Sequence, residues 1–373
     1  MRVLYLTNIP SPYRVKFFNE LGKFCELTVL FETRYSKERD KKWTSDIARN
    51  YKAIFMKGIR YGVAEAICPE VFKYLSPKKY DVIVVGMYSS PTGMLAIEYM
   101  RLRKIKFILN TDGGIIKKDI PVAHKFKQHF IGSASAWLST GDMATDYLCY
   151  YGAKREKVYK YPFTSVSHDD IVSASSFCKS DKSLIKKQLE ISEEKVILTV
   201  GRFSYENGYG KGYDTLLRVA EQDNTGAGIY IVGDKPTAEF QKWKEEKKLT
   251  NVHYVDFKTK NVLAMYYASA DLFVLLSKMD VWGLVINEAM AYSLPIIATD
   301  RCGAGVELVK NGENGFVIKV GDDKTLAEKI NYILSSSERT QKFGHNSFEI
   351  ILNYTIENMA SVHNDIFEIW GDS

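Results

Sequence analysis

The chain has 373 residues, more than one hydrophobic core usually serves, which favours two domains. Hydrophobic residues make up 46% and charged residues 26%, as in folded globular proteins, and no apolar run approaches the roughly 18 residues of a membrane span. Five scattered cysteines without a C-x-x-C pair argue against a disulfide framework or a zinc site. The apolar start of the chain is too short for a signal peptide, so we expect a cytoplasmic protein.

The net charge of +6 is divided unevenly along the chain. Residues 1–189 hold 32 Lys and Arg against 18 Asp and Glu, whereas residues 190–373 hold 19 against 27. A first half with a balance of +14 would attract anionic lipid headgroups, phosphorylated acceptors or nucleic acid. The alternative interpretation is a solvated surface rich in lysine.

The first half alternates short β-rich runs with amphipathic stretches, which predicts a parallel sheet with helical crossovers. The expected strands are Val3–Thr7, Leu27–Phe31, Val82–Gly86, Phe107–Asn110 and Ala136–Ser139. The expected helices are Val15–Lys23, Ala64–Tyr74, Gly93–Arg103, Ala123–Ile131 and Asp142–Tyr151.

A serine-rich stretch with few apolar residues follows, and we interpret residues 166–190 as a linker. The alternation then restarts with strands at Val196–Val200, Ile229–Val232, Val252–Val255, Leu272–Leu276 and Ile296–Ala298. We therefore expect an N-terminal α/β domain at 1–165, a second at 191–350, and a terminal helix within 351–373. Both domains should be doubly wound, with ligands bound at the carboxyl ends of their strands.

Several common motifs are absent from the sequence. It has no P-loop, because Lys211 is followed by glycine instead of a hydroxyl residue, and no G-x-G-x-x-G follows the first strand. No Asp-x-Asp occurs to hold a metal ion against a diphosphate. If this protein binds a diphosphate, other groups must neutralise it.

Two segments of the second half supply such groups. Gly201 and Arg202 end a strand, and Lys211 opens the next helix, so two cations and helix amides could hold two phosphates. Further on, Asp280 precedes and Glu288 lies within a helix that begins near Gly283, and the two acids could address two parts of an elongated ligand. The competing interpretation is an ordinary helix start followed by a surface glutamate.

The run A-D-x-x-V-x-x-S-x-x-[ED]-x-[FW]-G-L-V-x-x-E-A-M-A at residues 270–291, with Pro295–Thr299 and Gly303–Leu308 after it, resembles family 4 of the retaining glycosyltransferases. The resemblance spans Val196 to about Ile333 and includes Leu4–Phe18. It implies the GT-B fold, in which two Rossmann-like domains face a central cleft. The terminal helix would then cross back to the N-terminal domain.

The resemblance also implies roles for individual residues. Glu288 would hold the nucleotide ribose, and Arg202 and Lys211 would hold the donor diphosphate in place of a metal ion, so no metal or other cofactor is expected. Asp280 stands where the family usually has Glu, which contacts the sugar hydroxyls. The remaining donor-binding residues implied by the resemblance are Gly201, Phe257, Lys258, Gly283, Leu284 and Val285.

In the N-terminal half, Pro12 and Arg14 follow the first strand, where relatives often carry a glycine-rich turn. Arg14 could contact donor phosphate or acceptor, or lie in solvent at a helix start. Asp112 and Gly113 end another strand, near where many relatives have a histidine that touches the donor sugar, and we predict that Gly113, like Pro12, binds the donor. Asp112 could orient the acceptor hydroxyl or accept its proton, and a structural Asp-Gly-Gly turn is the alternative.

The helix near 117–131 combines Ile120, Ala123, Phe126 and Phe130 on one face with Lys117, Lys118, Lys125 and Lys127 around it. This pattern suits a helix that lies on an anionic bilayer, and a core-facing helix is the competing interpretation.

The resemblance thus implies a metal-independent retaining glycosyltransferase of bacterial surface-polysaccharide type. It would move a sugar from a nucleotide-diphosphate sugar to a saccharide acceptor, either lipid-linked or free, at the inner face of the membrane, without a nucleic-acid partner. Two alternatives remain: a nucleotide-sugar epimerase of the GT-B fold, and an inert protein of that fold that binds nucleotide sugars.

Overall fold

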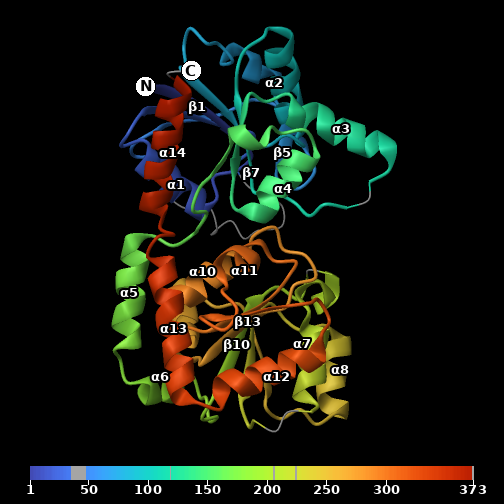
Figure 1. Cartoon of the computed structure of the whole chain (residues 1–373), viewed down its shortest axis with the longest axis vertical. Helices are drawn as coiled ribbons and strands as arrows, with labels where there is room; N and C mark the ends of the chain where they lie inside the picture. The colour runs from blue at the N-terminus through green and yellow to red at the C-terminus, as the bar shows by residue number, and fades with distance from the viewer. Residues whose placement is uncertain (35–47, 118, 205, 223–224, 372–373) are drawn as a thin grey trace. The chain divides into compact units, whose positions relative to one another are not determined.

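The computed structural model describes residues 1–34, 48–117, 119–204, 206–222 and 225–371. The chain forms two compact units (Figure 1). Unit 1 comprises Met1–Ser165 together with Thr355–Ser373, and unit 2 comprises Val166–Tyr354.

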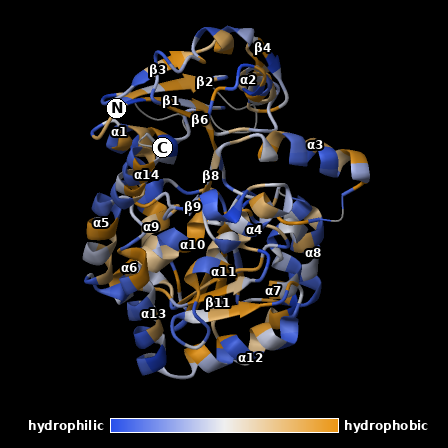
Figure 2. Cartoon of the chain, turned by 45° about the horizontal axis from the view of Figure 1, so that its top comes forward, coloured by the Kyte–Doolittle hydropathy of each residue, from blue (hydrophilic) through white to orange (hydrophobic). Residues whose placement is uncertain are grey.

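The described part of unit 1 contains a parallel sheet with the strand order β3-β2-β1-β6-β7-β8-β9. Its central strands are buried and mostly apolar, as Figure 2 shows for β1 and β2. The strands are β1 (Arg2–Thr7), β2 (Glu26–Phe31), β3 (Lys52–Phe55), β6 (Val82–Val85), β7 (Ile108–Thr111), β8 (Ala136–Ser139) and β9 (Val158–Lys160).

The helices of unit 1 begin where the sequence provides start signals. Proline occupies the first turn of three of them, where its missing N–H costs no hydrogen bond, and Ser90 caps α2 by accepting from the Gly93 N–H. The helices are α1 (Pro12–Leu21), α2 (Pro91–Leu102), α3 (Pro121–Gly132), α4 (Asp142–Tyr150) and α14 (Ile356–Gly371), with the 3₁₀ turn η3 (Arg155–Lys157).

The helix expected at Ala64–Tyr74 is wrong. The segment instead forms strand β5 (Glu65–Ile67) and the 3₁₀ helix η2 (Pro69–Lys73), and β5 pairs antiparallel with β4 (Ile59–Tyr61). Pro69 cannot donate within a helix, and the buried Glu32 carboxylate accepts the Ala66 N–H. A tertiary contact therefore overrides the helical periodicity here.

Unit 2 contains a second parallel sheet, with the strand order β12-β11-β10-β13-β14-β15 among its described residues. Its strands are β10 (Val196–Gly201), β11 (Gly228–Gly233), β12 (Val252–Val255), β13 (Leu272–Leu275), β14 (Ile296–Thr299) and β15 (Gly315–Ile318). Its helices are α5 (His168–Cys178), α6 (Lys182–Gln188), η4 (Glu206–Lys211), α7 (Tyr213–Ala220), α8 (Ala238–Glu246), α9 (Lys260–Ser269), α10 (Leu284–Ala291), α11 (Gly303–Leu308), α12 (Asp323–Leu334) and α13 (Ser337–Ile351).

The linker expected at 166–190 is also wrong, because these residues form α5 and α6 of unit 2. Ser167 and Asp170 make a reciprocal capping box at the start of α5. Lys182 pairs with Asp271 at 2.5 Å and so ties α6 to the loop before β13. Serine-rich composition was therefore a helix-start signal in this stretch.

The last helix, α14, belongs to unit 1 and packs beside α1 (Figure 1). The buried His363 ring contacts Phe17 of α1 and Tyr161, with ring centroids 4.7 and 4.4 Å away. The unit 1 core is thus completed by residues from both ends of the chain. The predicted α/β class, with two doubly wound parallel sheets, is confirmed.

Among the described residues, the structure contains no helix whose length and apolar character would suffice to cross a bilayer.

Candidate functional site

The strongest convergence of predicted residues lies at the carboxyl end of β10. The Lys211 ammonium lies 2.8 Å from the Asp280 carboxylate, and both side chains are about four-fifths buried, with 18% and 20% exposed. Gly201 makes room for this pair, because a Cβ there would lie 3.4 Å from Cδ and Cε of Lys211. The chain therefore brings a predicted phosphate cation and a predicted sugar carboxylate into direct contact.

The segment between Arg202 and Lys211 folds back on the sheet. Glu206, Asn207 and Gly208 all have positive φ, and η4 returns Lys211 to the end of β10. At Gly212, with φ of 72°, a Cβ would lie 2.1 Å from the Leu276 carbonyl, so only glycine allows this close approach. The extra residues in this stretch thus leave Lys211 at the site.

Arg202 is exposed just after β10, in a loop held by a residue that the sequence analysis missed. Asp234, directly after β11, accepts hydrogen bonds from the backbone N–H groups of Phe203 and Ser204. The Gly201–Gly233 pairing of these neighbouring strands places Asp234 beside the loop. The sequence did offer a signal for Asp234, because it is an acid that directly follows a strand next to β10. The carboxyl ends of neighbouring parallel strands lie at the same edge of the sheet.

Hydrogen bonds with residues at the start of α11 hold the loop before α10 in place. Asp280 exchanges backbone hydrogen bonds with this neighbouring loop, donating to Arg301 and accepting from Gly303. The Trp282 carbonyl accepts from the Ala304 N–H at 2.7 Å and from the Cys302 thiol at 2.9 Å. The backbone that carries Asp280 is therefore fixed by main-chain contacts on both sides.

Gly283 is the N-cap of α10 and has φ of 93°, which disfavours any side chain. It contributes no capping side chain, and no acid lies in the first turn, which contains Leu284 and Val285. The amides at the start of this eight-residue helix have the polarity to bind anionic oxygens, as the sequence analysis expected.

Glu288 lies one turn further along α10 and is half-buried, so the alternative of a plain surface glutamate does not describe it. Its carboxylate accepts a hydrogen bond of 3.0 Å from the Tyr267 hydroxyl. Burial, together with the charge of Glu288, raises the pKa of Tyr267 well above its ordinary value. Tyr267 is a supporting residue that the sequence gave no reason to select.

Phe257 and Lys258 lie on the loop between β12 and α9, at the carboxyl edge of the same sheet. Phe257 is 78% exposed, whereas Lys258 is half-buried. Their contact with a nucleotide base stays a prediction.

In unit 1, Arg14 and Asp112 form an ion pair. Arg14 Nη2 lies 3.2 and 3.3 Å from the two Asp112 oxygens, and its Nε donates to the Tyr13 hydroxyl at 3.2 Å. The Arg14 side chain is only 12% exposed, so the alternative of a solvated arginine at the helix start is wrong. Pro12 begins α1 and directs Arg14 toward the end of β7.

A buried hydrogen-bond network lies next to this pair, and the sequence analysis missed it. Asn110 Nδ2 donates to the Tyr5 hydroxyl at 2.5 Å, and the Tyr161 hydroxyl donates to Asn110 Oδ1 at 3.2 Å. Burial raises the pKa of both tyrosines, which keeps them neutral. These side chains come from β1, β7 and the end of β9, so only the sheet order brings them together.

The glycines after Asp112 have a structural reason of their own. Gly113 has φ of 96°, and a Cβ there would lie 2.6 Å from the Ala144 Cβ of α4. A Cβ on Gly114 would lie 2.6 Å from the Tyr147 ring. Close packing on α4 therefore accounts for both glycines, in agreement with the alternative of a structural turn. Donor binding by Gly113 stays a prediction.

Helix α3 extends outward from the sheet of unit 1, as Figure 1 shows. Only Phe130 and Ile131, near its C-terminal end, are buried, so the interpretation as a core-facing helix is wrong for most of its length. Ile120, Val122 and Phe126 are 71%, 76% and 45% exposed, and the exposed Lys117 and Lys125 lie among them. Lys127 instead pairs with Asp119, and Lys118 lies outside the described residues.

Comparison with known proteins gives a match over the part of the chain that holds the Lys211–Asp280 pair. Residues 181–349 match the family model described as glycosyl transferases group 1. The predicted resemblance to family 4 of the glycosyltransferases is thereby confirmed.

The curated relatives cover only part of the chain. The N-acetyl-alpha-D-glucosaminyl L-malate synthase of Bacillus anthracis is 29% identical over 51% of this chain and 50% of its own length. An uncharacterized glycosyltransferase of Haemophilus influenzae is 30% identical over 49% of this chain and 52% of its own. The capsular polysaccharide biosynthesis glycosyltransferase CapM of Staphylococcus aureus is 34% identical over 24% of this chain and 23% of its own. The chain thus spans about half or less of these relatives.

Solved structures match over the whole chain. Anabaena Alr3699/HepE, solved in complex with UDP, aligns with a TM-score of 0.76 at 17% identity and 100% coverage of both chains. Sucrose-phosphate synthase from Thermosynechococcus elongatus aligns with a TM-score of 0.74 at 19% identity, again over 100% of both. At such identities the likeness concerns the fold, and it confirms the predicted GT-B class with two Rossmann-like domains.

The glycosyl transferases group 1 match includes Arg202, Lys211, Asp280 and Glu288, whereas Arg14 and Asp112 lie outside it. Among the described residues, no cluster of three or more His, Cys, Asp or Glu side chains could hold a metal ion. Metal-independent chemistry stays a prediction.

Proposed function

We propose that this chain is a retaining glycosyltransferase that moves a sugar from a nucleotide-diphosphate sugar to a saccharide acceptor in cell-surface polysaccharide biosynthesis. The Lys211–Asp280 pair carries the proposal, because it places a cation for phosphate next to a carboxylate for sugar hydroxyls at the end of one sheet. Relatives named for capsule synthesis and neighbours solved with UDP or UDP-glucose support it.

In the proposed reaction the bond between the anomeric carbon and the diphosphate breaks, and the acceptor oxygen bonds to that carbon on the same face. Arg202, Lys211 and the amides after Gly283 stabilise the charge that develops on the leaving diphosphate, in place of a metal ion. Asp280 binds the sugar hydroxyls, and Glu288, oriented by Tyr267, binds the ribose hydroxyls.

We assign the acceptor to unit 1. Asp112, held by Arg14, is the candidate to accept the proton of the acceptor hydroxyl, since its side chain is 36% exposed. The apolar side chains of α3 and the lysines among them support contact with an anionic membrane. Such contact would bring a lipid-linked saccharide to the enzyme.

The proposal is tested by incubating the protein with a panel of sugar nucleotides and saccharide acceptors. Release of nucleoside diphosphate together with a lengthened saccharide supports transfer. An epimerised donor would identify the nucleotide-sugar epimerase instead, and nucleotide binding without any turnover would identify the inert alternative.

The ribose contact gives a sharper test of the donor site. We expect the protein to bind UDP more tightly than 2′-deoxy-UDP, and Glu288→Gln to remove most of this preference, because a charged hydrogen bond contributes about 1.5–3 kcal/mol. Calorimetric titration of both ligands into both proteins measures this effect. Glu307→Gln, on α11 of the same unit, is the control and should keep the wild-type preference. An unchanged preference in Glu288→Gln would refute the assignment of Glu288.

A further inference from the structure

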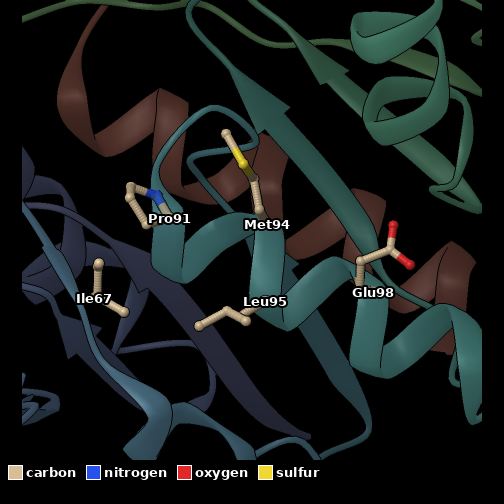
Figure 3. A pocket seen from close by; sticks show the side chains of 5 residues that line it. All are labelled: Ile67, Pro91, Met94, Leu95 and Glu98. Atoms are coloured by element: carbon tan, nitrogen blue, oxygen red, sulfur yellow. The ribbon is translucent and has the colours of Figure 1, made fainter.

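An apolar groove on α2 of unit 1 has no role in the site described above. It has a volume of about 300 Å³ and is lined by Ile67, Pro91, Met94, Leu95 and Glu98 (Figure 3). The four α2 residues stand at positions i, i+3, i+4 and i+7, so they share one helix face, and Ile67 of β5 forms the opposite wall. Glu98 is the single charged lining residue and lies at one end of the groove.

Buried hydrogen bonds fix the positions of the two walls of the groove. The Glu32 carboxylate accepts from the Ala66 N–H of β5 at 3.0 Å and from the Ser90 hydroxyl at the start of α2 at 2.5 Å. The Thr92 hydroxyl accepts from the Cys68 N–H at 2.9 Å and donates to the Ala66 carbonyl at 2.6 Å. The groove is therefore built into the fold, because both walls are fixed to the same buried groups.

At the charged end of the groove, the Glu98 carboxylate has hydrogen-bond donors that offset its burial. A basic segment of the chain follows this end. Burial alone would raise the pKa of Glu98, but hydrogen bonds from His129 and Arg101 lower it. Glu98 is the single acid in residues 91–106. Beyond it, Leu102 is 74% exposed on the same helix face, and the following exposed cations are Arg103, Lys104 and Lys106.

The direction of α2 relates the groove to the proposed acceptor residues. Because α2 follows β6, its first turn lies at the carboxyl edge of the sheet, where Arg14 and Asp112 also lie. Its C-terminal end, with the basic segment, lies toward the opposite edge. A ligand in the groove would thus have one end near the acceptor residues and the other near cations suited to an anionic bilayer.

We propose that this groove holds the hydrocarbon chain of a lipid-linked saccharide acceptor, with the saccharide toward Asp112 and the chain leaving past Leu102 into an anionic membrane. This rests on the proposed transferase function for the identity of the head group. Apolar walls that lead toward exposed cations match a hydrocarbon chain that enters an anionic membrane.

The first test measures binding of alkyl phosphates to the full chain by calorimetry, below their micelle concentrations. Affinity should rise from octyl to hexadecyl phosphate, because each buried methylene raises it about fourfold. Leu95→Glu should weaken hexadecyl phosphate binding at least tenfold, since it places a carboxylate in the groove. Leu184→Glu, at an exposed leucine of α6 in unit 2, is the matched control and should change affinity less than threefold. Met94→Trp, which fills the groove without a charge, should weaken binding as well.

Circular dichroism and an unchanged affinity for UDP would show that the variants are folded. Equal losses in Leu95→Glu and Leu184→Glu, or no dependence on chain length, would overturn the proposal. So would a dimer in solution that Leu95→Glu dissociates, because the groove would then bind a second copy.

The second test separates this inference from the transferase function. With a lipid-linked acceptor, Leu95→Glu should raise KM at least tenfold with little change in kcat, and with the same saccharide lacking the lipid it should match the wild type. Transfer to both acceptors with equal KM in the wild type would refute the groove assignment and leave the transferase function standing. Binding of alkyl phosphates without transfer to any acceptor would refute the function, and with it the saccharide head group.

Discussion

Lys211 and Asp280 neutralise one another, and this affects how a donor would bind. A diphosphate near Lys211 would provide an alternative anion, so Asp280 could turn to sugar hydroxyls without leaving an unpaired charge buried. Asp is one methylene shorter than the family's usual Glu, and its contact with Lys211 gives the short carboxylate a defined position. In the proposed reaction the pair would link phosphate binding to sugar binding at the level of two side chains.

Replacing Lys211 tests this link. Lys211→Ala should lower kcat/KM for the sugar nucleotide by about 10²–10³-fold, because a charge aimed at the leaving diphosphate is lost. The rate of nucleoside diphosphate release measures the effect. Lys242→Ala, on exposed α8, is the control and should leave the rate unchanged. A decrease of less than threefold in Lys211→Ala would remove Lys211 from the site.

Gly283 provides a second test at the residue scale. Its φ is 93°, and a Cβ would lie 2.7 Å from the Cys302 sulfur and 2.8 Å from Leu275 Cδ2. Gly312 has a similar φ of 80°, but a Cβ there meets no atom within 4 Å. Gly312→Ala should therefore lower the free energy of unfolding by about 1 kcal/mol from backbone strain alone, and Gly283→Ala by about 2 kcal/mol more. Urea unfolding of both variants gives the difference, and equal losses would contradict the close packing around Gly283.

At the scale of elements, Glu32 joins the end of β2 to β5 and to the start of α2. It is 3% exposed, and burial raises its pKa to about 7 despite hydrogen bonds from Ser90 and Ala66. Glu65 adds to the increase, because a second negative charge also disfavours ionisation. The Glu32 carboxyl group thus joins the β4–β5 hairpin to α2, and in this folded environment its protonated form is favoured.

This predicts how the stability of unit 1 depends on pH. The folded protein holds the Glu32 proton up to about pH 7, whereas the unfolded chain releases it near 4.5, so the stabilisation is complete below pH 4.5 and is lost as the pH rises to 7. The loss from this group is about 3 kcal/mol. Glu32→Gln cannot ionise, so its stability relative to the wild type should increase by about that amount between pH 4.5 and pH 8. Urea unfolding at several pH values measures the difference, and a constant difference would refute the raised pKa.

At the scale of the whole molecule, the chain returns to its first unit at its end. α14 buries Met359, His363 and Phe367 against unit 1, although some 190 residues of unit 2 intervene in the sequence. Burial lowers the pKa of His363 to about 4, so the ring is neutral in this core at physiological pH. Unit 1 therefore depends on residues that follow unit 2 in the sequence.

A chain ending at Tyr354 tests that dependence. Loss of α14 exposes the apolar face of α1, including Phe17, so unit 1 should unfold at a lower temperature or fail to fold. Unit 2 retains all of its own elements, and UDP affinity should remain within about threefold. Calorimetry and UDP titration of the truncated and full chains separate the two effects. Loss of UDP binding together with unit 1 would contradict the independence of unit 2.

Local sequence signals determined much of this protein: the strand and helix alternation, the GT-B class, and the motif that contains Asp280, Gly283 and Glu288. These signals work because strand ends, glycine conformations and helix starts depend on neighbouring residues. Composition misled at the serine-rich helices α5 and α6, which begin at local caps. Periodicity misled at Ala64–Tyr74, where a tertiary contact was stronger. The tertiary structure alone decided the pairs Lys211–Asp280 and Arg14–Asp112, the support from Asp234 and Tyr267, and the groove on α2. Each of these joins residues far apart in the chain, and their distance is set by sheet order and packing, which no short stretch of sequence contains.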